Sequence, residues 1–161
     1  MSRCDDLDNW TPPHAAIKQS NPRPRILCVD DDEESREMLS MLLNLWRIEA
    51  KAVGTGTQAL SLMQAERFDL YLLDTCLPDL DGFELCRRMR DFDPHTPILF
   101  YSGAAYEADK QKGLEAGANA YLTKPDVDAL VSSITQFVAR DQTQAAAGTA
   151  RVTMCSARSA P

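Results

Sequence analysis

Several features that would direct this chain of 161 residues to a membrane or to a disulfide-bonded fold are missing. No apolar run approaches the length of a bilayer span, and no apolar stretch near the N-terminus resembles a secretory signal. The five cysteines are an odd number without metal-site spacing, which favours reduced thiols. We therefore expect a cytoplasmic protein that neither enters nor binds a membrane.

An excess of basic residues is also missing. Residues 25–141 contain 21 acidic and 12 basic side chains, a net charge of −9. Because nucleic-acid binding begins with neutralisation of phosphates, this balance predicts no direct nucleic-acid partner. Acidic side chains gathered at one place would instead suit a divalent cation.

The chain shows no internal repeat and no second domain. Residues 1–24 contain four prolines and little apolar periodicity, so we expect an irregular N-terminal extension. Residues 25–140 are expected to form the single domain. Periodicity stops at Asp141, and residues 141–161 are small or polar, which predicts a flexible C-terminal tail.

Within residues 25–140, apolar runs alternate five times with amphipathic segments. Strands are expected at 25–29, at 48–53, in the run that ends at Asp74, at 98–101 and at 118–122. Helices are expected to follow them, the last one ending at about Arg140. This alternation predicts an α/β fold with a doubly wound parallel sheet, in the flavodoxin-like strand order 2-1-3-4-5.

Polar residues follow four of the five predicted strands. The first strand runs into Asp30 and Asp31, the third into Asp74 and the fourth into Ser102, and Lys124 follows the fifth. These ends share one edge of a parallel sheet, where such folds place their ligands. The acids Asp32, Glu33 and Glu34 are better explained as residues that favour the start of a helix.

The chemistry of such a set is direct. Crowded carboxylates repel one another, and Mg²⁺ relieves that repulsion while it takes phosphate oxygens as further ligands. Asp74 could then attack a phosphodonor and form an aspartyl phosphate. Lys124 would neutralise one phosphoryl oxygen and Ser102 would hydrogen-bond another. The alternative for Ser102 is a simple turn residue before Gly103.

The motifs at 26–32, 72–82, 102–103 and 121–125 resemble, in order and spacing, the receiver domain of two-component response regulators, including the chemotaxis type. The resemblance covers about residues 25–140. It implies that Asp74 is the phosphoacceptor and that Lys124 is the lysine typical of the family. The implied magnesium ligands are Asp30, Asp31, Asp74 and the backbone carbonyl of Cys76. The implied switch residues are Ser102 and Tyr121. It also implies a cis peptide bond before Pro125.

Tyr121 has an alternative explanation as a partly buried strand residue. Asp126 departs from the family pattern, which usually has an apolar residue there, and we expect it to cap the last helix.

No DNA-binding or enzymatic output domain follows the matched region, so we expect a stand-alone receiver, and the resemblance implies a phosphoprotein of a phosphorelay. It accepts a phosphoryl group from a histidine kinase or a phosphotransfer protein, and it contacts a downstream protein through about residues 105–140. It is not an enzyme, although it could hydrolyse its own aspartyl phosphate.

Two alternatives stay open. A haloacid-dehalogenase-type phosphatase also uses a strand-end Asp and Mg²⁺, but it has a second Asp two residues later, where this chain has Cys76. A receiver-like module that binds partners without phosphorylation is the other.

Overall fold

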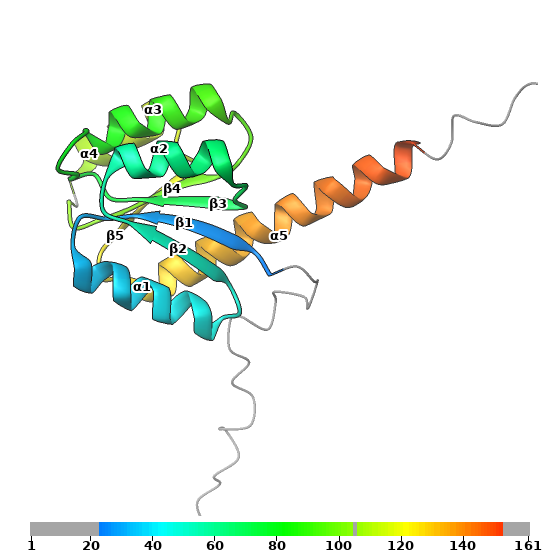
Figure 1. Ribbon diagram of the computed structural model, residues 1–161, viewed down its shortest axis with the longest axis horizontal. Coiled ribbons are helices and arrows are strands. Elements are labelled where there is room, and N and C mark those ends of the chain that lie inside the picture. The colour runs from blue at the N-terminus through cyan, green and yellow to red at the C-terminus, as the bar shows by residue number, and fades with distance from the viewer. Residues whose placement is uncertain (1–22, 105, 153–161) are drawn as a thin grey trace, which may run out of the picture.

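Strands and helices alternate along the computed structural model, which describes residues 23–104 and 106–152 (Figure 1). The strands are β1 (Arg25–Val29), β2 (Glu49–Val53), β3 (Leu70–Leu73), β4 (Ile98–Ser102) and β5 (Ala120–Thr123). The helices are α1 (Glu33–Leu45), α2 (Gly56–Ala65), α3 (Gly82–Phe92), α4 (Glu107–Glu115) and α5 (Val127–Val152). In the described ranges no helix is long and apolar enough to cross a membrane.

All strand pairs are parallel, and the order is β2-β1-β3-β4-β5, so the predicted flavodoxin-like topology is confirmed. The register aligns the ends of the two central strands, because Val29 lies opposite Leu73. The amide of Asp74 donates to the carbonyl of Val29 at 2.8 Å, which continues this pairing one residue past β3. The residues that follow β1 and β3 therefore emerge side by side.

Helices cover both faces of the sheet, with α2 and α3 on one side and α1 and α5 on the other (Figure 1). Alternate residues of β1 enter different cores: Leu27 and Val29 join the cluster under α2 and α3, whereas Ile26 and Cys28 join the cluster under α1 and α5. Since both faces of a central parallel strand are buried, its residues are continuously apolar. The polar residues beyond the strand ends therefore mark the boundary of the core.

Helix α5 is longer than predicted. Its backbone remains helical to Val152, and Figure 1 shows that its distal part extends past the strands. The predicted end of the last helix at about Arg140 is thus wrong, because the helix continues through residues 141–152, where alanine and glutamine are common. These residues favour a helix without needing an apolar stripe, so the loss of periodicity did not mark the end of the helix. Residues 1–22 and 153–161 lie outside the described part, where the expected extension and tail stay predictions.

The start of α3 packs unusually close to the end of β3. A Cβ atom on Gly82 would lie 2.7 Å from Thr75 Cα and 2.9 Å from Thr75 O, and it would also collide with the carbonyl of Asp74. The amide of Gly82 donates to Thr75 O at 3.1 Å. Only a residue without a side chain allows this approach, which closes the base of the loop between β3 and α3.

We expect Gly82→Ala to lower the free energy of unfolding by about 2–3 kcal/mol, because backbone would have to move. Gly103→Ala is the matched control, since a Cβ there meets nothing within 4 Å. Its effect should stay within about 0.5 kcal/mol. Urea denaturation followed by circular dichroism measures both, and equal losses would contradict the close-packing explanation.

Candidate functional site

The predicted polar residues meet at the carboxyl edge of the sheet. Asp30 follows β1, Asp74 follows β3, Ser102 ends β4 and Lys124 follows β5. The amide of Lys124 donates to Ser102 O at 2.9 Å, so the last two strands remain paired up to the site. Four chain segments far apart in sequence therefore supply one pocket.

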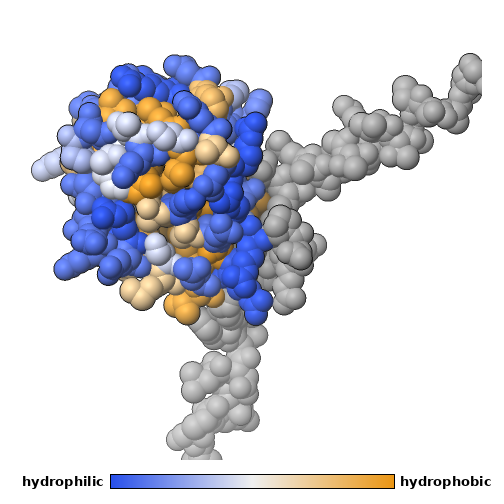
Figure 2. Space-filling view, viewed as in Figure 1, coloured by the Kyte–Doolittle hydropathy of each residue, from blue (hydrophilic) through white to orange (hydrophobic). Residues whose placement is uncertain are grey.

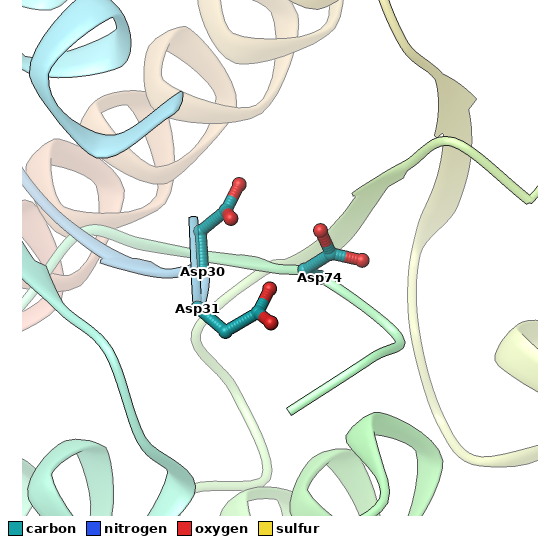
Figure 3. Close-up of side chains that lie close together, drawn as sticks. All are labelled: Asp30, Asp31 and Asp74. Atoms are coloured by element: carbon teal, nitrogen blue, oxygen red, sulfur yellow. The ribbon is translucent and has the colours of Figure 1, made fainter. Parts of the chain in front are cut away.

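Three carboxylates converge in this pocket. Asp30 and Asp74 are buried, with 2% and 8% of their surfaces exposed, whereas Asp31 is exposed. One oxygen from each lies within 4.8 Å of the others. Figure 3 shows the three side chains reaching toward a shared space between the ends of β1 and β3. This all-oxygen donor set suits a hard divalent cation such as Mg²⁺, so the residues present fit the predicted ion.

Lys124 lies between two of the acids. Its Nζ donates to Asp30 Oδ2 at 2.6 Å and to Asp74 Oδ2 at 2.8 Å. Burial alone would raise the pKa of Asp74, but the hydrogen bond and charge of Lys124 outweigh it and hold that pKa below its usual value. Burial likewise opposes the charged form of Lys124, yet Asp30 and Asp74 raise its pKa above the ordinary one. At neutral pH the pocket therefore contains an ionised Asp74, the form needed for nucleophilic attack.

Backbone and hydroxyl donors fix the orientation of Asp74. Its Oδ1 accepts from the amides of Thr75 at 2.6 Å and Cys76 at 3.3 Å. The Thr75 hydroxyl also lies 2.6 Å from Ser102 Oγ, which is 1% exposed. Ser102 therefore contacts the neighbour of Asp74 directly, and its switch role stays a prediction. Thr75 was not predicted as a site residue; its one sequence signal is a hydroxyl next to the strand-end acid.

Two residues of helix α1 form hydrogen bonds with Asp30 and Asp31. Ser35 Oγ donates to Asp30 Oδ2 at 2.8 Å, and Arg36 donates to the carbonyls of Asp30 and Asp31, both at 2.8 Å. Asp32 accepts from the Ser35 amide and caps α1, which confirms its predicted role as a helix-start residue. The supporting roles of Ser35 and Arg36 were missed, because a polar first turn is common in any helix.

The remaining predicted residues lie around the pocket. Tyr121 is half-buried, and its ring packs against that of Phe100 with the centroids 5.6 Å apart. Its hydroxyl donates to Ala104 O at 2.8 Å. The Lys124–Pro125 peptide bond is cis, as predicted, and Asp126 accepts from the amide of Ala129 at the start of α5, as expected of a cap. Cys76 is exposed beside Asp74. The switch role of Tyr121 and the metal-ligand role of the Cys76 carbonyl stay predictions.

Two curated proteins with similar sequences are regulators longer than this chain. The chain is 41% identical over 103 residues to the DNA-binding response regulator MtrA of Mycobacterium tuberculosis, covering 64% of this chain and 45% of that protein. It is 40% identical over 116 residues to the transcriptional regulatory protein CseB of Streptomyces coelicolor, covering 71% of this chain and 49% of CseB. This chain therefore spans about half the length of these relatives.

Two solved structures match this chain over nearly their whole length. A putative response regulator from Chloroflexus aurantiacus superposes with a TM-score of 0.69 at 33% identity, covering 73% of this chain and 98% of that one. The chemotaxis response regulator CheY4 of Vibrio cholerae superposes with a TM-score of 0.65 at 30% identity, covering 72% of this chain and 98% of CheY4.

A family profile completes the assignment. The profile described as response regulator receiver domain matches residues 26–135, a span that contains all the pocket residues described above. This match identifies the chain as a receiver of two-component signalling and speaks against the phosphatase alternative, which belongs to a different family. From fold, pocket and profile together, this chain belongs to the response regulator receiver family.

Proposed function

We propose that this protein acts as a stand-alone receiver that takes a phosphoryl group onto Asp74 from a histidine kinase or a phosphotransfer protein. The observation that carries the proposal is the state of Asp74, which is buried, ionised and paired with Lys124 at 2.8 Å beside two further acids. A carboxylate with these neighbours is oriented and charged before any phosphodonor arrives.

In the proposed reaction, a carboxylate oxygen of Asp74 forms a bond to phosphorus while the bond from phosphorus to the donor nitrogen breaks. Lys124 would form an ion pair with the incoming phosphoryl group, because its ammonium group is already within hydrogen-bonding distance of Asp74. Mg²⁺ bound by Asp30, Asp31, Asp74 and the Cys76 carbonyl would neutralise phosphoryl oxygens. The amides of Thr75 and Cys76 keep the carboxylate aligned.

We assign the response to Ser102 and Tyr121. The new phosphoryl group adds a charge of about −1.5 to −2, which a buried hydroxyl such as Ser102 can stabilise by donating a hydrogen bond. A shift of Ser102 would disturb Ala104, whose amide lies 3.4 Å from Ser102 Oγ and whose carbonyl accepts from Tyr121. Through Ala104 and Tyr121 the shift would reach α4, β5 and α5. These elements belong to the surface at about 105–140 that is proposed to contact a downstream protein.

The output of the chain is proposed to be protein contact in the cytoplasm. MtrA is a DNA-binding response regulator by name, and the match to this chain covers 45% of it. The net charge of −9 over residues 25–141 opposes binding of these residues to the phosphate backbone of a nucleic acid. A phosphorylation-independent binding role is the second candidate, and the first experiment below distinguishes the two.

Incubation with acetyl phosphate and Mg²⁺ should shift the wild type on a phosphate-affinity gel, whereas Asp74→Asn should not shift. Asp81→Asn is the matched control, because it changes another Asp of the same loop whose side chain caps α3 instead. Lys124→Met should slow the reaction about 100-fold, since it removes the charge that stabilises the transferred group. An unshifted wild type would leave the phosphorylation-independent role.

Mg²⁺ at about 100 times its dissociation constant should raise the free energy of unfolding of the wild type by about 2.7 kcal/mol. Asp31→Asn should lose most of this gain and be at least as stable as wild type without Mg²⁺, because it removes one of three crowded charges. Asp32→Asn keeps a residue able to cap α1 and should retain the gain. Thermal melts with and without Mg²⁺ measure the gain. Retention in Asp31→Asn would refute the ligand assignment.

A further inference from the structure

The loop between β3 and α3, residues 74–82, carries both Asp74 and the Cys76 carbonyl proposed for the metal. Its base is closed where the Gly82 amide donates to Thr75 O. Three residues beyond Cys76, the loop touches a different helix. That contact is made by Asp79, a residue that neither the pocket nor the family match explains.

Asp79 binds the first turn of α2 through three hydrogen bonds. The amide of Gly56 donates to Oδ1 at 2.9 Å, and the amide and hydroxyl of Thr57 donate to Oδ2 at 2.8 and 2.6 Å. The first amides of a helix have no partner within it, so this carboxylate satisfies two of them from outside. These bonds lower the pKa of Asp79 to about 2, so the carboxylate is charged at any physiological pH.

The helix already has an ordinary cap of its own. Thr55 Oγ1 accepts from the amide of Gln58 at 3.2 Å, so α2 does not depend on Asp79 to begin. Next to these hydrogen bonds, Leu80 packs closely against Gly56. A Cβ atom on Gly56 would lie 3.2 Å from two carbon atoms of the Leu80 side chain. The loop and α2 therefore meet in a polar contact and an apolar contact next to each other.

We propose that Asp79 is a positioning residue that tethers the metal-binding loop to α2 and so sets the affinity of the pocket for Mg²⁺. The inference rests on the proposed function, because it assumes that the Cys76 carbonyl faces the ion. A loop that is free in solution loses conformational entropy when it binds an ion. With Gly82 fixing one end and Asp79 fixing the apex, that entropy has been lost before Mg²⁺ arrives.

The coupling must act in both directions. If the tether strengthens Mg²⁺ binding, bound Mg²⁺ must strengthen the tether by the same factor. The amides of Gly56 and Thr57 on α2 should therefore sense occupancy of a pocket to which α2 contributes no ligand. Leu77 and Leu80 also hold the loop through packing on the core under α2 and α3. Such apolar contacts are non-directional, and if they sufficed alone Asp79 would be dispensable.

The test compares Mg²⁺ affinity by isothermal titration calorimetry in the wild type, Asp79→Ala and Thr55→Val. The alanine variant should bind Mg²⁺ about five- to tenfold more weakly, the loss expected from one or two hydrogen bonds. Thr55→Val removes the helix's own cap and leaves the tether, so its dissociation constant should match the wild type even if its stability falls. Asp79→Asn keeps one acceptor oxygen and should lie between; it also serves if the alanine variant does not fold.

Hydrogen exchange of the Gly56 and Thr57 amides gives a second readout. Saturating Mg²⁺ should slow their exchange in the wild type by about the same five- to tenfold factor, and the effect should vanish in Asp79→Ala. Equal dissociation constants in wild type and Asp79→Ala would overturn the tether. A wild type that does not bind Mg²⁺ would instead overturn the metal part of the proposed function, so the two failures are distinguishable.

Discussion

The hydrogen bonds from Lys124 to Asp30 and Asp74 are the interaction on which the pocket depends. They join residues 94 and 50 positions apart and link the ends of β1, β3 and β5. Two buried carboxylates without a nearby cation would repel each other and resist ionisation. Lys124 keeps Asp74 charged and compensates the repulsion between the two buried carboxylates.

The sheet supplies the precision that this charge arrangement needs. The central strands are buried on both faces by two apolar clusters, so the first polar residues past their ends are forced to the carboxyl edge. Support then comes from the adjoining segments: Arg36 from α1 holds the carbonyls after β1, and Thr75 links Asp74 to Ser102. The backbone after β1 and the segment that carries Asp74 are thus held in place by neighbouring side chains.

The site residues that directly follow or end a strand could be predicted from the sequence. Apolar runs show where each strand ends, and the order of the strands shows which ends lie side by side. Asp30, Asp31, Asp74, Ser102 and Lys124 all came together as expected. Thr75 and Asp79 were missed, because their roles depend on which hydroxyl or amide of another element lies opposite, and periodicity carries no such information. The end of α5 was missed for a different reason, since alanine and glutamine favour a helix by propensity, without an apolar period that would mark its length.

The pairing of Val29 with Leu73 has a consequence for how this chain can change over evolutionary time. A shift of one residue in β3 would move Asp74 by about 3.3 Å and turn its side chain to the opposite face of the sheet. An insertion at the other edge, in the turn at 93–97, leaves that pairing untouched. The length of each central strand is therefore constrained by the position of the acid at its end, whereas the length of this turn at the amino edge is not constrained in this way.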